Sequence, residues 1–85
     1  MYFAYILFSL KDKGIYTGYT SNIALRFRQH CNGLVKPTMD RRPLKLIYYE
    51  AYRYQKDALN REKYLKTGWG RYYLNKVIKN YLSHQ

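Results

Sequence analysis

Residues 2–20 read YFAYILFSLKDKGIYTGYT, and this stretch decides the fold. The segment from Tyr2 to Ser9 is dense in aromatic and β-branched residues, which predicts a buried strand. The sequence KDKG at 11–14 has the composition of a turn, and the segment from Ile15 to Thr20 predicts a second strand. The two strands are therefore expected to pair as an antiparallel hairpin.

The rest of the chain alternates between polar breaks and amphipathic stretches. It predicts, in order, a helix from about residue 22 to His30 ended by Asn32-Gly33, a polar loop with Pro37 and Pro43, a strand at 44–51, a helix at 55–66, a bend at Trp69-Gly70 and a helix at 71–82. The predicted fold class is α/β, with a three-stranded sheet, flanking helices and the order β-β-α-β-α-α. Because 85 residues cannot enclose two cores, we expect a single domain over residues 1–85.

The charge of the chain is strongly unbalanced. There are 16 Lys and Arg against 5 Asp and Glu, a formal net charge of +11. Such an excess favours a polyanionic partner, because each neutralised phosphate releases condensed counterions. The 12 Tyr residues add flat faces for bases and hydroxyls for phosphates. The single cysteine, Cys31, excludes a disulfide framework and a Cys-rich zinc site.

The apolar run from Tyr2 to Leu10 is too short to span a bilayer. It also lacks a basic leading region and a small-residue cleavage site. We therefore expect a cytoplasmic protein that does not act at a membrane, and a monomer by default, with a dimer as an alternative.

Two basic residues share a helix face that should be apolar. Ile23 and Phe27 form the apolar stripe of the first predicted helix, and Arg26 and His30 lie largely on the same side. An Arg on such a face points into a polar cleft with a partner, or extends its stem to water. The pattern alone leaves both interpretations open.

The second predicted helix carries a charge of opposite sign in a similar position. Glu62 falls between Ala58, Leu59 and Leu65 on the inner face. A carboxylate there is costly unless a cation or a donor meets it, so a structural ion pair, for instance with Arg26, is one interpretation. The other is a shared polar cleft, in which a cation binds phosphate and a carboxylate binds a metal.

The predicted hairpin adds hydroxyl groups to this picture. Pairing of the two strands could bring the rings of Tyr5 and Tyr16 to one side of the sheet. Gly18 weakens strand pairing unless something must approach the backbone closely there.

Taken as a set, these residues resemble the GIY-YIG nuclease superfamily, in particular its short stand-alone bacterial members, which are grouped as an uncharacterised protein family. The first motif reads Phe3-Ala4-Tyr5, and the second reads Tyr16-Thr17-Gly18 in place of YIG. The similarity covers nearly the whole chain and includes TMDRRPLKLIYYE at 38–50 and REKYLK at 61–66.

The resemblance implies a metal-dependent DNA endonuclease that leaves a 5′-phosphate and a 3′-hydroxyl. It implies one divalent ion, Mg²⁺ or Mn²⁺, held by Glu62 with waters and substrate oxygens. Arg26 would stabilise charge on the scissile phosphate, and Tyr16 or Tyr5 would take the proton of the attacking water, with Tyr16 favoured. His30 could instead relay that proton.

The partner implied is DNA, whether single-stranded, branched or duplex. A non-catalytic basic and aromatic nucleic-acid-binding module is the alternative, because it would use the same surface without needing Glu62. The residues expected to contact nucleic acid are Gly18, Arg28, Lys36, Arg41, Arg42, Arg61 and Lys63.

Overall fold

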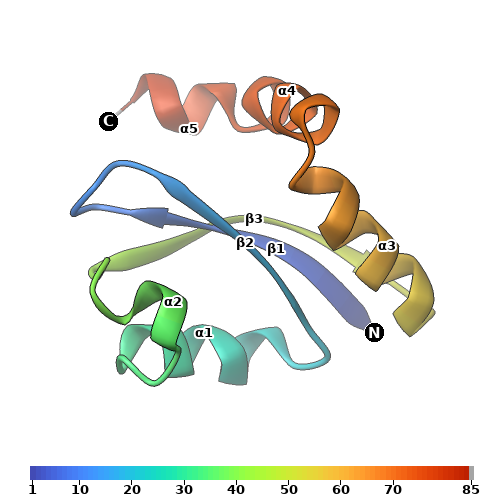
Figure 1. Cartoon of the computed structure of the whole chain (residues 1–85), viewed down its shortest axis with the longest axis horizontal. Helices are drawn as coiled ribbons and strands as arrows, with labels where there is room; N and C mark the ends of the chain where they lie inside the picture. The colour runs from blue at the N-terminus through green and yellow to red at the C-terminus, as the bar shows by residue number, and fades with distance from the viewer. Residues whose placement is uncertain (85) are drawn as a thin grey trace.

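A computed structural model describes residues 1–84 and shows a central sheet with helices on both of its faces (Figure 1). In chain order the elements are β1 (Tyr2–Ser9), β2 (Ile15–Thr20), α1 (Ile23–Cys31), α2 (Lys36–Met39), β3 (Leu44–Tyr52), α3 (Gln55–Leu65), α4 (Gly68–Val77) and α5 (Lys79–Ser83). The strands are antiparallel in the order β2-β1-β3. The predicted α/β fold class, its three strands and its flanking helices are confirmed.

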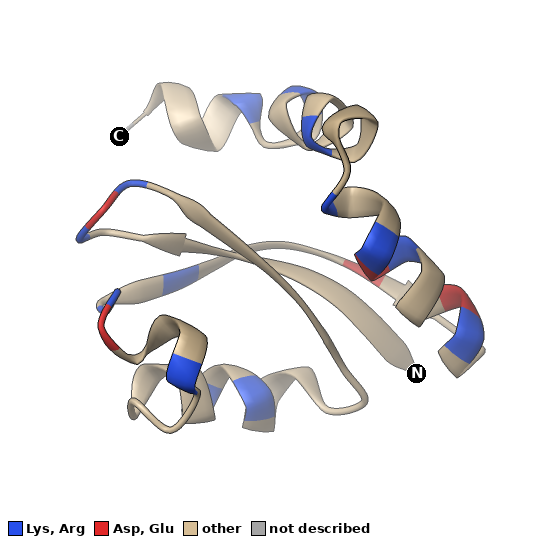
Figure 2. Ribbon diagram, viewed as in Figure 1, with Lys and Arg blue, Asp and Glu red and all other residues tan. Residues whose placement is uncertain are grey.

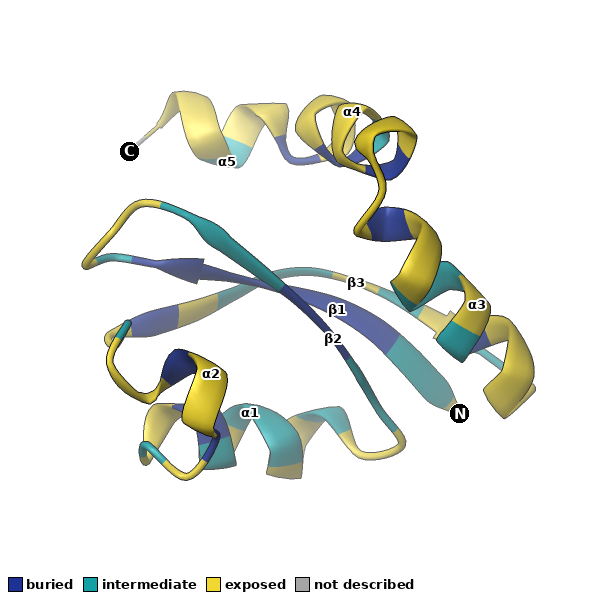
Figure 3. Ribbon diagram, in the orientation of Figure 1, coloured by how far each residue is buried: buried dark blue, intermediate teal, exposed yellow. Residues whose placement is uncertain are grey.

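The central strand β1 is buried on both faces because α1 and α2 cover one face while α3, α4 and α5 cover the other (Figures 1 and 3). Side chains alternate along a strand, so successive residues enter different cores. Ala4 and Ile6 pack with Leu65 of α3 and Leu74 of α4. Tyr5 and Leu7 pack with Leu44 and with side chains of α1. An almost unbroken apolar strand is the sequence pattern that this two-sided burial requires.

The hairpin register places the expected residues on one face. Tyr5 pairs with Gly18, and Leu7 pairs with Tyr16. Cross-strand partners point to the same side, as do residues two apart along a strand. The rings of Tyr5 and Tyr16 therefore share the face that α1 covers, with centroids 6.5 Å apart. The expectation that both rings lie on one side is confirmed.

Gly18 is buried beneath the phenol of Tyr5. A Cβ atom at this position would lie 2.4 Å from both Cζ and the hydroxyl oxygen of Tyr5. The close approach that the sequence indicated at Gly18 is thus made by a side chain of the same hairpin. Gly18 acts here as a packing residue that lets the Tyr5 ring lie flat across β2.

The first helix begins and ends as expected, but the loop after it contains a further helix. The side chain of Asn22 caps α1 by accepting a hydrogen bond from the Leu25 amide, and Gly33 follows the helix with a φ of 75°. The loop expected around Pro37 contains the four-residue helix α2, with Pro37 in its first turn. A single turn has no apolar periodicity of its own, and sequence patterns do not detect it.

The prediction for the C-terminal segment was wrong in two places. Trp69 and Gly70 do not form a bend but lie in the first turn of α4, because the hydroxyl of Thr67 caps that helix by accepting from the Gly70 amide at 3.1 Å. Gly70 also lets α4 start against the end of α3, since a Cβ there would lie 2.0 Å from the Tyr64 carbonyl oxygen. In addition, the predicted helix at 71–82 is divided at Ile78 into α4 and α5.

Replacing Gly18 with alanine should destabilise the protein by about 1–3 kcal/mol, since the added methyl group overlaps the Tyr5 ring and forces one of the two to move. The free energy of unfolding, measured by urea denaturation, tests this. Gly68→Ala is the matched control, because a Cβ at Gly68 meets nothing within 4 Å. Equal stability of the two variants would show that Tyr5 does not lie across Gly18.

Candidate active site

A chain of buried hydrogen bonds links β1, α1 and α2. The hydroxyl of Tyr5 is 2.7 Å from Nε2 of His30, and Nδ1 of His30 is 2.7 Å from the hydroxyl of Thr38. Thr38 in turn donates to the Val35 carbonyl at 3.4 Å, which leaves its oxygen to accept from Nδ1–H. Nε2 is then the acceptor for the Tyr5 hydroxyl. His30 is accordingly a neutral imidazole in a defined tautomer, fully buried and with both nitrogens bonded.

Burial sets the protonation of both partners. It lowers the pKa of His30 to about 4, and the nearby charge of Arg26 adds to this shift. Burial also raises the pKa of Tyr5 to about 12, although the Arg26 guanidinium acts in the opposite direction. At neutral pH the pair is therefore an uncharged phenol donating to an uncharged imidazole.

Arg26 lies one helical turn before His30 and is half-buried beside the Tyr5 hydroxyl. Its Nη1 donates to Oε1 of Gln29 at 3.2 Å. The guanidinium affects the pKa of both Tyr5 and His30, so it lies at the polar cluster and does not simply extend to bulk water. Of the two interpretations that the sequence left open, the structure favours the one in which Arg26 has a polar partner on the covered face of the sheet.

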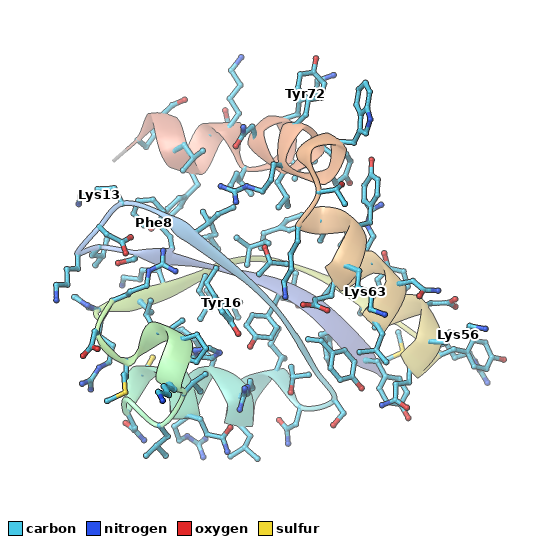
Figure 4. The ribbon with its side chains drawn as sticks, viewed as in Figure 1. Phe8, Lys13, Tyr16, Lys56, Lys63 and Tyr72 are labelled. Carbon is cyan, nitrogen blue, oxygen red and sulfur yellow. The ribbon has the colours of Figure 1, made fainter. Side chains whose placement is uncertain are left out.

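Tyr16 completes the group of rings. Its ring centroid lies 5.3 Å from that of His30 and 6.5 Å from that of Tyr5. Figure 4 shows the Tyr16 side chain pointing from β2 toward α1. It is half-buried, whereas Tyr5 and His30 are buried, so Tyr16 is the member of this group that water and ligands reach most easily.

Glu62 lies on α3, within electrostatic range of Tyr5. Its side chain is 14% exposed and pairs with Lys66 one turn further along the helix, so the ion pair expected with Arg26 is made with Lys66 instead. Glu62 also contributes to the raised pKa of Tyr5, which places its charge in the same electrostatic environment. Because Lys66 is 55% exposed, it can swing away when another cation binds Glu62.

The donor set fits a single hard cation held mostly by water. Among residues 1–84 no group of three or more His, Cys, Asp and Glu side chains is placed to hold a metal. Mg²⁺ keeps several waters and commonly takes only one or two protein carboxylates together with substrate phosphates. A lone, largely buried carboxylate with a displaceable lysine partner, such as Glu62, meets that requirement.

Two of the expected phosphate contacts already have carboxylate partners within the fold. Arg41 pairs with Asp12 at 2.6 Å and lowers the pKa of that carboxyl. Arg61 pairs with Glu50 at 2.7 Å. By contrast, four of the expected contacts are exposed and have no carboxylate partner in the described chain: Arg28, Lys36, Arg42 and Lys63.

Glu50 is the centre of a hydrogen-bond network that the sequence did not indicate. Its carboxylate accepts from the hydroxyls of Tyr48 at 2.5 Å and Tyr52 at 2.6 Å, as well as from Arg61. The guanidinium of Arg61 also lies 4.8 Å from the ring centroid of Tyr73. The network joins β3 to α3 and α4, and so it fixes α3, which carries Glu62.

Comparison with known protein families identifies the class to which the chain belongs. Residues 1–76 match the model of the GIY-YIG catalytic domain, and the chain belongs to that family. GIY-YIG catalytic domains are found in endonucleases, and the family therefore indicates a nuclease. No helix among residues 1–84 has both the length and the apolar character that crossing a membrane requires.

Within the family the chain is similar to small proteins of the UPF0213 group. It is 42% identical over 67 residues to UPF0213 protein CPE1444 of Clostridium perfringens, a match that covers 78% of this chain and 71% of that one. It is 39% identical to UPF0213 protein SH2523 of Staphylococcus haemolyticus, with 78% and 80% covered. The solution NMR structure of UPF0213 protein BH0048 from Bacillus halodurans aligns with a TM-score of 0.55 and 30% identity, covering 91% of this chain and 85% of that one.

The stability of the protein should fall as the pH drops from about 6.5 to about 4. In this range the unfolded chain protonates His30 at its ordinary pKa of 6.5, whereas the folded chain keeps it neutral down to about 4. The unfolded state then binds more protons, so acid favours it, by roughly 3 kcal/mol at most.

Urea denaturation across this pH range measures the effect, and an NMR titration of the His30 ring gives its pKa directly. A His30→Gln variant should be less stable at neutral pH but should lose the slope between the two pKa values. A wild-type protein equally stable at both ends of the range would show that His30 is not buried in the neutral form.

Proposed function

We propose that the chain is a metal-dependent endonuclease that hydrolyses DNA phosphodiester bonds through one divalent ion. The observation that carries the proposal is a polar cluster of Tyr5, Tyr16, Arg26 and His30, built by the hairpin and α1, with the charge of Glu62 on α3 close enough to act on the Tyr5 hydroxyl. A surface that only bound nucleic acid would need exposed cations. It would not need a buried phenol–imidazole pair beside a shielded carboxylate.

Opposite charges at this cluster supply what a phosphate-cleaving site needs. Arg26 would bind the non-bridging oxygens of the scissile phosphate and stabilise the charge that builds on them. Glu62 would hold Mg²⁺ or Mn²⁺, which when bound supplies Lewis-acid polarisation and lowers the pKa of nearby hydroxyl groups. Lys66 would leave Glu62 at that stage and become free to contact phosphate.

We assign to Tyr16 the role of the base that takes the proton of the attacking water. His30 is fully buried with both nitrogens bonded, so it cannot reach that water directly. The hydroxyl of Tyr5 is committed to His30, and its pKa is raised to about 12, so at neutral pH it stays protonated and is not available to take a proton from water. Tyr16 is half-buried at the edge of the same cluster, so its hydroxyl is the one of the three that water can reach.

The basic surface supports DNA as the partner. Lys and Arg residues lie on the helices of both faces of the sheet (Figure 2). The exposed residues proposed to contact phosphate are Arg28 on α1, Lys36 on α2, Arg42 in the loop between α2 and β3, and Lys63 on α3. We further propose that the protein works as a monomer in the cytoplasm, cutting one strand at a time.

Cleavage of labelled single-stranded, duplex and branched DNA tests the nuclease proposal. Cutting should require Mg²⁺ or Mn²⁺, stop with EDTA, and fall in Glu62→Gln to the level seen with EDTA, because the amide does not replace a carboxylate as ligand. Asp57→Asn is the matched control, since Asp57 is an exposed acid in the first turn of the same helix. If no substrate is cut while salt-sensitive binding persists in both variants, the protein is a non-catalytic binding module.

Two phenylalanine variants separate the roles of the phenols. Tyr16→Phe should lower the cleavage rate by roughly 10²- to 10⁴-fold, the usual contribution of a general base, with little change in stability. Tyr5→Phe should chiefly cost stability, about 1–3 kcal/mol, because it leaves Nε2 of His30 buried without a partner. Single-turnover rates and urea denaturation measure both effects. Normal cutting by Tyr16→Phe with none by Tyr5→Phe would move the role to Tyr5, with His30 receiving its proton.

A further inference from the structure

The outer face of α4 displays large aromatic rings that the fold does not use. Trp69 is 78% exposed and Tyr72 is 60% exposed, whereas Leu74 of the same helix is buried in the core. Figure 4 shows Tyr72 pointing away from the sheet. Side chains as exposed as these contribute little to core packing, so their presence calls for a function outside the fold.

The two rings and a lysine form one stripe. Trp69, Tyr72 and Lys76 are spaced by three and four residues, which places them on one face of the helix. The ammonium of Lys76 lies 4.7 Å from the Tyr72 ring centroid. These three residues are called the α4 platform below, and they combine flat faces with a positive charge.

The C-terminal segment that carries the α4 platform has basic side chains and no acidic ones. No Asp or Glu follows Glu62 in the sequence, while five Lys and Arg residues do: Lys63, Lys66, Arg71, Lys76 and Lys79. An anionic partner bound on α4 therefore meets no repelling carboxylate side chain from α4 or α5. The charge complements a polyanion, and the rings complement something with flat faces of its own.

The α4 platform also lies close in sequence to the proposed metal ligand. Glu62 pairs with Lys66 at the end of α3, Thr67 caps α4, and Trp69 lies in the first turn of α4. The segment that carries the α4 platform therefore follows directly on the end of the helix that carries Glu62.

We propose that the α4 platform binds unpaired bases of a nucleic-acid strand, which makes single-stranded DNA, or the unpaired arm of a branched DNA, the substrate class. Duplex bases are stacked on one another and do not offer their faces, whereas every unpaired base has a free face for an aromatic ring. Lys76 and Arg71 contact the flanking phosphates. The inference of a substrate rests on the proposed function, but the binding itself does not require catalysis.

Trp69 is the only tryptophan of the chain, and it reports directly on the α4 platform. In EDTA, which prevents cutting, a short oligo(dT) should quench the intrinsic fluorescence of the wild-type protein. Inorganic polyphosphate, an anion without bases, should bind without comparable quenching, and a blunt duplex should quench weakly. Equal quenching by polyphosphate and oligo(dT) would contradict stacking.

Substitution gives the second readout. Trp69→Ala should weaken binding of labelled oligo(dT), followed by anisotropy, by roughly 5- to 100-fold, the range for loss of one stacked base, while affinity for polyphosphate stays unchanged. Tyr54→Ala is the matched control. Tyr54 is 64% exposed but precedes the first residue of α3, roughly 16 Å along that helix from its other end. Equal affinity of Trp69→Ala and wild type, or equal losses in both variants, would overturn the proposal.

The same experiments distinguish nucleic acid from other partners of the α4 platform, and they test the platform separately from the nuclease proposal. A blue shift of Trp69 emission with phosphatidylglycerol vesicles and no response to oligo(dT) would assign the α4 platform to a membrane surface. A dimer that Trp69→Ala converts to a monomer would assign it to a second copy of the chain, and either result overturns the proposal. Glu62→Gln should still bind oligo(dT) in EDTA, so loss of cutting in this variant would not count against the α4 platform. Loss of oligo(dT) binding in Trp69→Ala would likewise not decide whether the protein cuts DNA with a metal.

Discussion

The hydrogen bond between the Tyr5 hydroxyl and Nε2 of His30, 2.7 Å long and closed off from water, is the contact on which the rest of the site depends. A buried imidazole without partners would cost about 1–3 kcal/mol, a large part of the stability that so small a domain can have. Gly18 gives the Tyr5 ring the space to reach His30, and Thr38 satisfies the opposite nitrogen. These contacts hold the hairpin, α1 and α2 in one arrangement, and they keep Arg26 beside Tyr5.

A second hydrogen-bond network, centred on Glu50, holds α3 and α4 against β3. Glu50 takes the hydroxyls of Tyr48 and Tyr52 together with the guanidinium of Arg61, and burial of these groups is tolerable because each has a partner. The network ties α3 to the sheet and so determines where Glu62 lies. It also accounts for part of the unusual tyrosine content, since phenylalanine at 48 or 52 could not bond this carboxylate. The rings of Trp69 and Tyr72 on α4 are among those that the fold leaves to solvent.

Much of the site could be predicted because its residues break a local pattern. Arg26 and Glu62 stand on helix faces that should be apolar, Gly18 interrupts a strand, and Tyr5 and Tyr16 are related by a hairpin register that the turn length determines. Thr38 and Glu50 gave no such signal. Thr38 lies in a four-residue helix without periodicity, and Glu50 alternates normally with its neighbours on a strand. The start of α4 was misjudged because Trp-Gly resembles a bend, although Thr67 was in position to cap a helix.

The amino-acid sequence by itself determined the strands, the main helices, the family and the basic character of the surface, because periodicity, turn composition and net charge are local or additive properties. Only the tertiary structure decided which polar side chains pair with one another. Arg41 with Asp12, Arg61 with Glu50 and His30 with Tyr5 join residues 29, 11 and 25 positions apart. A chain with 16 basic residues offers many partners for each of its 5 acids. The choice among them depends on desolvation and distance, which exist only once the sheet and its helices have packed.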